Sequence, residues 1–485
     1  MTERNDAFLQ IAEKWKPALY TREVSVSGSG ETMKKGDSLR LDFGEHLVGT
    51  VRLELTPRGS HPDAPVWLCL KFAERLQELN ENVENYHGWI SASWVQQEQV
   101  HVDELPCVLR LPRRYAFRYV EIEVLDISSK YDLVVDRAVC EAVSSADDAV
   151  LRAYETADTQ LREIDRIACR TLHDCMQEVF EDGPKRDRRL WIGDLRLQAL
   201  VNYETYRQND LVKRCLYLFA GSTLPGGRVG AAMFIRPEIE VDDTCMFDYS
   251  LFFLPTLLDY YEATADAEAL SSLWPTAWRQ IELAQESFDE NGLVRDSNVL
   301  GWCFLDWNLG LNKQAGAQGV YLYCLRAAGK IASILQDRER AAWIEADYAK
   351  KKQAACEYLY DRTLGLFVSG AERQISWASQ IWMVLGGASD AAVLDRIANL
   401  PEAVGMVTPY MYHHYVQALI DAGRKAEALK VLKSYWGGMA ELGADTFWEL
   451  YNPENPDESP YGGTIVNSYC HAWSCAPAYF LRKYF

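Results

Sequence analysis

The stretch FEDGPKRDRRLWIGD, residues 180–194, interrupts a long series of helical patterns and carries eight charged side chains. Proline lacks an amide donor and restricts the residue before it, so a helix cannot continue through Asp182-Gly183-Pro184. Immediately afterwards, Leu197, Leu200 and Val201 have the spacing of a buried helix face. We therefore expect a loop between two helices. A charged run of this kind is commonly a solvated surface, but the aromatic residues within it favour a packed loop.

The spacing of apolar residues changes near residue 145. Before it, apolar and polar residues alternate, as in TVRLEL (50–55), VWLCLKF (66–72) and YVEIEVL (119–125), which predicts antiparallel strands. After it, the period is helical. We therefore predict an N-terminal antiparallel β-sandwich in residues 1–145, with 1–24 as a leading segment, followed by an (α/α)6 toroid in residues 146–485. The expected helices are 149–173, 194–208, 210–219, 248–261, 265–287, 316–335, 339–359, 377–384, 391–400, 410–422, 425–440 and 467–484.

Composition narrows the class of protein. The 485 residues carry a net charge of −20 without a basic stripe, which argues against nucleic acid and anionic membrane surfaces as partners. We find no apolar run of membrane-spanning length and no apolar signal core at the N-terminus. Twelve cysteines without a CxxC pair indicate reduced thiols and a cytoplasmic location. The eight histidines are dispersed, so we predict no metal site. The oligomeric state stays open between monomer and homodimer.

Further loops combine acids with aromatic residues. Asp306 lies between Trp302 and Trp307, and Glu449 follows Trp448 in the stretch TFWELYN, residues 446–452. An acidic turn occupies residues 236–243, and His471 lies in NSYCHAW, residues 467–473. Each alone has an ordinary explanation: a helix cap for Glu449, a turn for Asp306, a core position for His471. Together, the carboxylates and the sugar-stacking tryptophans are typical of a glycoside hydrolase.

Glycosidic bond hydrolysis explains why two carboxyl groups are needed. One must be protonated to assist the leaving oxygen, and the second acts on the opposite face of the sugar ring. A separation of about 6.5–9.5 Å leaves room for a water molecule and inverts the anomeric centre. The acid needs a raised pKa, which burial or neighbouring carboxylates supply. Asp182, Asp187 and Asp194 are candidates for that environment.

Several motifs resemble glycoside hydrolase family 78, the α-L-rhamnosidases. The family signature Asp-(Cys/Gly)-Pro-x-Arg-(Asp)-Glu-Arg-x-Gly-Trp-x-Gly-Asp is similar to residues 182–186 and 191–194. The stretch around Glu449 resembles the family's Thr-x-x-Trp-Glu, CHAWS (470–474) its late histidine motif, and residues 301–308 its Gly-Asp-Trp stretch in spacing. LDFGEHLVG (41–49), FAE (72–74) and FRYVE (117–121) resemble its β-domain.

The resemblance implies a fold, an activity and roles for individual residues. It implies an inverting exo-glycosidase for terminal α-L-rhamnose on small glycosides or oligosaccharides, without a cofactor. Asp187 would be the general acid, in place of the usual glutamate, and Glu449 the general base. The residues implied to bind the sugar are Asp182, Arg186, Trp191, Asp194, Trp302, Asp306, Trp307, Trp448 and His471.

Two other interpretations remain from the sequence. Toroids of this kind also serve enzymes for glucosides and unsaturated uronides, and the fold does not decide among them. Arg186, Arg188 and Arg189 would suit the carboxylate of a uronide. The third possibility is a non-catalytic sugar-binding protein, which the aspartate at position 187 favours and the retained Glu449 opposes.

Overall fold

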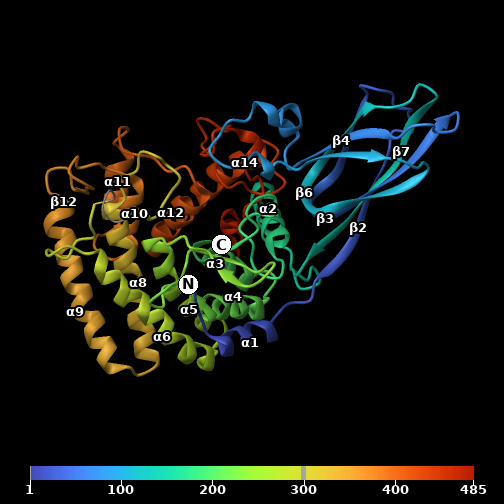
Figure 1. The fold of residues 1–485 in the computed structure, drawn as a ribbon. Coiled ribbons are helices and arrows are strands. Elements are labelled where there is room, and N and C mark those ends of the chain that lie inside the picture. Colours follow the sequence, from blue (N-terminus) through green and yellow to red (C-terminus); the bar gives the residue numbers. More distant parts are fainter. Residues whose placement is uncertain (1, 297–301) are drawn as a thin grey trace.

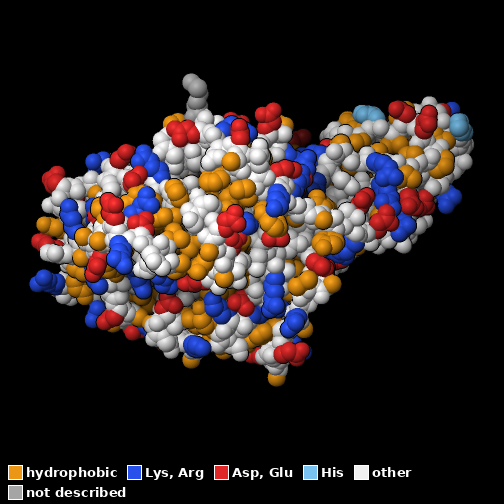
Figure 2. Space-filling model, turned by 90° about the horizontal axis from the view of Figure 1, so that it is seen from below, with side chains coloured by type: hydrophobic (Ala, Val, Ile, Leu, Met, Phe, Trp, Pro, Cys, Tyr) orange, Lys and Arg blue, Asp and Glu red, His pale blue; other side chains and the backbone are white. Residues whose placement is uncertain are grey.

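The computed structural model describes residues 2–296 and 302–485 and divides into a β-sheet part and a larger helical part (Figure 1). Acidic and basic side chains are interspersed over the face of the molecule seen in Figure 2. No helix among the described residues is both long enough and apolar enough to cross a bilayer.

The β-sheet part is one antiparallel sheet whose strand order is β2-β7-β3-β6-β4-β5. Its strands are β2 (Tyr20–Ser27), β3 (Ser38–Gly59), β4 (Val66–Ala73), β5 (Gln97–Val102), β6 (Cys107–Asp126) and β7 (Tyr131–Ser144). Register shifts between Asp42 and Leu47 and between Thr50 and Arg52 interrupt the pairing of β3 with β6, as β-bulges do. Inward-facing side chains of the strands share one apolar core, which confirms the alternating pattern of the sequence.

Six helices of the helical part form a closed inner ring, in which each contacts the next. In order they are α3 (Ile192–Glu204), α5 (Phe247–Thr264), α8 (Gln314–Ile334), α10 (Trp377–Leu385), α12 (Pro409–Asp421) and α15 (Ala476–Tyr484). Side chains on all faces of α3 are buried from Ile192 to Asn202, because the helix has neighbours on every side. An inner helix therefore lacks a polar face.

Six further helices pack outside this ring: α2 (Thr159–Cys175), α4 (Asn209–Gly221), α6 (Ala267–Ala284), α9 (Arg338–Ala354), α11 (Ala392–Ala398) and α13 (Lys425–Val431). On α9 only Ile344, Lys351 and Ala354 are buried, as expected for an outer helix. Shorter helical segments are η1 (Leu76–Asn80), η2 (Val83–Asn85), η3 (Ala92–Trp94), η4 (Gln285–Ser287), η5 (Ala355–Leu359), η6 (Leu432–Trp436), α14 (Gly437–Glu441), η7 (Thr464–Val466) and η8 (Ala472–Cys475). The predicted alternation of inner and outer helices is thus confirmed in the described residues.

Two predicted helices begin too early. The helix expected from residue 149 starts at Thr159, because the Asp158 side chain caps it by accepting from the amides of Gln160 and Leu161. The helix expected from residue 467 starts at Ala476. Residues 467–471 are not helical, since their backbone groups bind other segments, such as the Tyr469 amide that donates to Glu74 Oε2 at 2.6 Å.

Two segments, one before the sheet and one between two of its strands, tie the β-sheet part to the helical part. Before the sheet, strand β1 (Glu3–Arg4) pairs with β9 (Ser222–Thr223), and helix α1 (Asp6–Lys14) packs on α4. Between β4 and β5, the segment holding η1–η3 reaches the helical part, where Trp89 Nε1 donates to the Pro460 carbonyl at 2.7 Å. This segment brings side chains of the β-sheet part to the loops of the toroid.

Short strands complete the described structure. Strand β8 (Leu190–Trp191) pairs with β10 (Ala232–Phe234), which pairs with β11 (Glu240–Val241). Strands β12 (Tyr360–Asp361) and β13 (Leu366–Phe367) form a separate hairpin. Strand β8 fixes the end of the 180–194 loop and the start of α3, so Trp191 has a defined position.

Candidate active site

A pocket opens at the N-terminal ends of the inner helices. Asp194 lies in the first turn of α3, Tyr249 in the first turn of α5, and Trp473 in η8 just before α15. The empty space, open mouth included, is ≈ 770 Å³. Nine of the residues predicted for the site line this pocket: Asp182, Arg186, Asp187, Trp191, Asp194, Trp302, Trp307, Glu449 and His471.

The 180–194 loop is closed by hydrogen bonds between its two ends. The amide of Asp182 donates to the Arg189 carbonyl at 3.0 Å, and the Arg189 amide donates to Asp182 Oδ1 at 3.0 Å. Between them, Asp187 and Arg188 have left-handed backbones with φ of 63° and 56°. The buried Lys185 ammonium ties the loop down by binding Glu78 and the Asn467 carbonyl. The loop is therefore packed, as its aromatic residues predicted.

Glu449 is held by two side chains. Its Oε2 accepts a hydrogen bond from Arg186 Nη2, and its Oε1 accepts one from the Tyr461 hydroxyl. The Arg186 guanidinium also lies over the Tyr461 ring, at 4.2 Å from its centroid. Arg186 Nη1 is 3.8 Å from Asp187 Oδ2. One guanidinium thus contacts both Glu449 and Asp187, the two residues predicted to be catalytic.

Three aspartates of the loop have raised pKa values. Burial is the main cause for each. The charges of Asp187 and Asp194 raise the pKa of Asp182 further, and Glu449 acts in the same direction on Asp187 and on Asp194. These three aspartates therefore retain protons at a higher pH than free aspartate does.

Several buried polar atoms of the pocket have no hydrogen-bond partner among the described residues. They are Trp191 Nε1, Asp194 Oδ1, Trp307 Nε1 and His471 Nδ1. Burial lowers the pKa of His471 well below 6.5, so its ring is neutral at pH 7. Buried polar groups are nearly always paired, so this set suits a ligand rich in hydroxyl groups.

Two residues predicted for the site do not line the pocket. The carboxylate of Asp306 is buried and accepts from the Thr408 hydroxyl at 2.6 Å and the Val407 amide at 3.0 Å, so it holds the start of α12. Trp448 is also buried, and the Arg75 guanidinium lies 4.3 Å from its ring centroid. Both side chains support the loops around the pocket from behind.

Other pocket residues were not predicted. Trp89 and Ile90 come from the β-sheet part, and the remainder are Arg189, Thr244, Met246, Tyr249, Phe304, Tyr461 and Trp473. Trp473 lies in the histidine motif and could have been found there. No sequence pattern pointed to Trp89 or Tyr461, which are 372 positions apart, yet their ring centroids lie at 5.5 Å.

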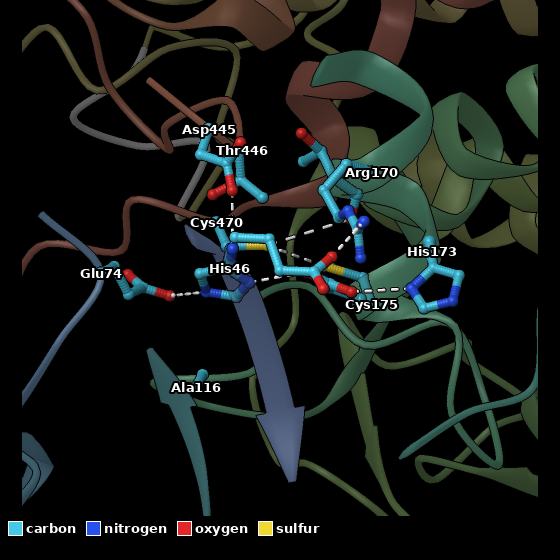
Figure 3. Close-up of polar contacts among 12 residues, drawn as sticks. His46, Glu74, Ala116, Arg170, His173, Cys175, Asp445, Thr446 and Cys470 are labelled. Atoms are coloured by element: carbon cyan, nitrogen blue, oxygen red, sulfur yellow. Dashed lines mark hydrogen bonds and ion pairs between the residues drawn. The ribbon is translucent and has the colours of Figure 1, made fainter. Parts of the chain in front are cut away.

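One buried group of described residues, outside the pocket, has the side chains of a metal site. His46, Asp174 and Cys470 place their ligand atoms within 4.8 Å of one another. However, His46 Nδ1 already contacts Asp174 Oδ2 at 2.6 Å, and its Nε2 contacts Glu74 Oε1 at 3.1 Å (Figure 3). Both ring nitrogens are thus engaged with carboxylates, and the group joins the β-sheet part to α2.

The double ring of helices, with carboxylates and indoles gathered at one end, defines a six-hairpin glycosidase. A model of the glycosyl hydrolase family 78 alpha-rhamnosidase N-terminal domain matches residues 10–142. A model of the bacterial alpha-L-rhamnosidase 6 hairpin glycosidase domain matches residues 151–485. The chain belongs to glycoside hydrolase family 78, the α-L-rhamnosidases, and is a glycoside hydrolase. The fold and family predicted from the sequence are confirmed.

Solved structures agree with this assignment. A rhamnosidase from Klebsiella oxytoca with rhamnose bound is 45% identical, with a TM-score of 0.96 over 100% of this chain and 99% of that chain. The family 78 rhamnosidase of Bacillus sp. GL1 shares the fold at 21% identity and a TM-score of 0.75, covering 92% of this chain and 46% of its own. The α-L-rhamnosidase of Streptomyces avermitilis complexed with L-rhamnose also shares the fold, at 17% identity and a TM-score of 0.70. The match covers 96% of this chain and 44% of that chain. No match was found among curated proteins.

Proposed function

We propose that this enzyme removes terminal α-L-rhamnosyl residues from small glycosides or oligosaccharides with inversion, using Asp187 as general acid and Glu449 as general base. The observation that carries the proposal is the shared guanidinium: Arg186 contacts Glu449 on one side and lies 3.8 Å from Asp187 on the other. The two carboxyl groups thus face one pocket with a cation between them. Two carboxyl groups that line one pocket are the groups required by a mechanism in which water attacks from the side opposite the leaving group.

The environments of the two residues support different roles. Hydrogen bonds from Arg186 and Tyr461 hold Glu449 as an oriented acceptor, as a base that takes a proton from water requires. Asp187 has a raised pKa through burial, so it can carry the proton that the leaving oxygen needs. Among the three loop aspartates, its side chain is the most exposed, at 19% against 6% for Asp182 and 3% for Asp194.

The walls of the pocket support rhamnose as the sugar. Asp194, His471 and the indole nitrogens offer partners for ring hydroxyls. Met246 and Phe304 add apolar surface that suits the methyl group at C6 of a deoxy sugar. The rhamnose bound to the 45% identical Klebsiella oxytoca rhamnosidase supports the same assignment.

Substrates whose leaving groups differ in basicity distinguish the role of the general acid from that of the general base. p-Nitrophenolate departs with little protonation, whereas an alkoxide must be protonated as it departs. We expect Asp187→Asn to reduce kcat/KM far more on methyl α-L-rhamnoside than on p-nitrophenyl α-L-rhamnoside. Glu449→Gln should reduce both about equally, by roughly 10³-fold or more. Proton NMR of the first-formed rhamnose should show inversion. Full activity of either variant, or release of the retained anomer, would reject the assignment.

A cytoplasmic location remains part of the proposal. All twelve cysteines are free thiols, including Cys175 and Cys470, whose sulfur atoms lie 3.9 Å apart. Such a pair suits a reducing compartment. Cell fractionation of the native host would test it.

A further inference from the structure

A second cavity lies beside Asp187, between the two parts of the protein. Its empty space, open mouth included, is ≈ 1020 Å³. Arg114 and Val143 line it from β6 and β7, and Phe234 and Arg236 line it from the segment at β10. Among the described residues, Asp187 alone lines both this cavity and the sugar pocket.

Arg188 brings a positive charge to this second cavity without a carboxylate partner. Its guanidinium donates to two backbone carbonyls, from Nε to Pro184 at 2.8 Å and from Nη2 to Arg114 at 2.9 Å. Among the residues that the structure describes, no carboxylate oxygen comes within 4.0 Å of it. These two hydrogen bonds fix the guanidinium in place.

The other arginines of the cavity are neutralised. Arg114 pairs with Glu181 at 2.6 Å, and Arg236 pairs with Glu178 at 2.6 Å. Burial, and then the charge of Arg114, lower the pKa of Arg188 to about 10. The charge of Glu181 acts in the opposite direction on that pKa, but Glu181 is paired with Arg114. A cation that burial disfavours gains from an added anion, because the anion replaces the interactions with water that burial has removed.

The position of Asp187 indicates what enters the second cavity. A general acid lies within hydrogen-bond reach of the leaving oxygen, roughly 2.6–3.2 Å, so the group that departs must lie next to Asp187. Since Asp187 borders the second cavity, an aglycone can extend from the sugar pocket into it. This step depends on the function proposed above.

We propose that the second cavity binds an aglycone bearing a single carboxylate, and that Arg188 recognises that carboxylate. A planar guanidinium matches a carboxylate through paired hydrogen bonds. One uncompensated cation suits one negative charge. A dianionic phosphate would place excess charge beside Glu178, Glu181 and Asp187. Apolar Leu19, Val143 and Phe234 provide surface for the body of the aglycone.

Two rhamnosides that differ only in aglycone charge test the proposal: 4-carboxyphenyl and 4-carbamoylphenyl α-L-rhamnoside. We expect the enzyme to prefer the carboxylate in kcat/KM, mainly through a lower KM. Arg188→Gln should reduce this preference, the ratio of the two kcat/KM values, about tenfold. Any effect of the substitution that is equal for both substrates cancels in that ratio. Arg188→Lys should retain part of it, because the charge remains.

Arg113→Gln is the matched control. It removes one positive charge close by, but Arg113 pairs with Glu98 at 2.6 Å and does not line the cavity, so the preference should persist. Isothermal titration with 4-hydroxybenzoate should show binding that Arg188→Gln weakens, and 4-hydroxyphenyl phosphate should bind less well.

The outcomes separate this inference from the proposed function. Hydrolysis of the carbamoyl substrate without any preference for the carboxylate would overturn the inference and leave the rhamnosidase function intact. A preference that survives Arg188→Gln, or tighter binding of the phosphate, would also overturn it. Failure to hydrolyse either substrate, or any other rhamnoside, would reject the proposed function itself.

Discussion

The guanidinium of Arg186 donates a hydrogen bond to the carboxylate of Glu449, 263 residues further along the chain. The same guanidinium stacks on Tyr461, whose hydroxyl donates to the other carboxylate oxygen of Glu449. The loop that carries the proposed acid therefore also orients the proposed base. If the 180–194 loop shifted, both of the proposed catalytic groups would be displaced together.

Removal of the Tyr461 hydroxyl tests this arrangement. Tyr461→Phe leaves the ring beneath Arg186 but deletes one of two hydrogen bonds to Glu449. Hydrogen bonds to charged groups contribute about 1.5–3 kcal/mol, so kcat/KM for p-nitrophenyl α-L-rhamnoside should fall by roughly tenfold or more. Tyr358→Phe, on a side chain that is 47% exposed, is the control. Equal activity of the two variants would contradict the positioning role of Tyr461.

The raised pKa of Asp187 predicts the alkaline limb of the pH profile. A general acid works only while protonated, and burial moves the pKa of Asp187 above its ordinary 3.8. Activity should therefore be retained above the pH at which free aspartate ionises, and should be lost as pH rises through the raised pKa. kcat/KM measured from pH 4 to 9 would show this limb. It should be absent from the residual activity of Asp187→Asn, and an unchanged limb in that variant would assign it to another group.

Trp89 predicts a contribution of the β-sheet part to substrate binding. Its indole is 67% exposed, lines the mouth of the pocket and is tied to Pro460 by its Nε1. Trp89→Ala should raise KM for aryl rhamnosides about fivefold, because stacking between aromatic rings contributes on the order of 1 kcal/mol. The melting temperature should change little. Trp67→Ala removes another exposed indole of the β-sheet part, away from the pocket, and should leave KM unchanged. Equal KM values for the two variants would mean that the substrate does not contact Trp89.

His46 predicts a pH-dependent contribution to stability. Burial disfavours its charged form, but contacts with Asp174 and Glu74 raise its pKa well above 6.5. A raised pKa means that this stabilisation is complete below pH 6.5 and declines as pH rises through the folded-state value. His46→Gln should unfold at lower temperature than wild type at pH 6, since breaking a buried pair costs about 3–5 kcal/mol.

The difference in melting temperature between wild type and His46→Gln should narrow as pH rises above neutrality. Scans at one heating rate, from pH 6 to 9, would measure it. His61→Gln, on an exposed histidine of the same sheet part, should match wild type throughout. A difference that widened with pH would mean that His46 is neutral in the folded protein.

Local patterns explain which parts of the fold could be predicted. The alternation in residues 50–55 places Val51, Leu53 and Leu55 in the core of the sheet, and the Gly-Pro turn at 183–184 interrupts the helices as expected. The start of α2 was placed too early because one side chain, Asp158, supplies a cap that periodicity does not detect. The segment 467–471 was misjudged because its amides bind Glu74 and the Phe447 carbonyl, which are distant in sequence.

The same distinction between local patterns and distant contacts applies to the candidate site. Asp182, Asp187 and Asp194 could be proposed together because one short loop carries them. Asp306 and Trp448 resemble site residues in sequence, yet their side chains turn to Thr408 and Arg75 behind the pocket. Spacing along a loop does not specify which side of the loop faces a ligand.

The sequence by itself determined the class of each half of the chain, the charged loop between helices, and the motifs that place it in family 78. These features depend on residues within a few positions of one another, where backbone geometry fixes the spacing. Only the tertiary structure decided that Arg186 and Tyr461 hold Glu449, that Trp89 reaches the pocket, and that Arg188 faces a second cavity. Those contacts join distant segments through packing between the two parts, and no local pattern records them.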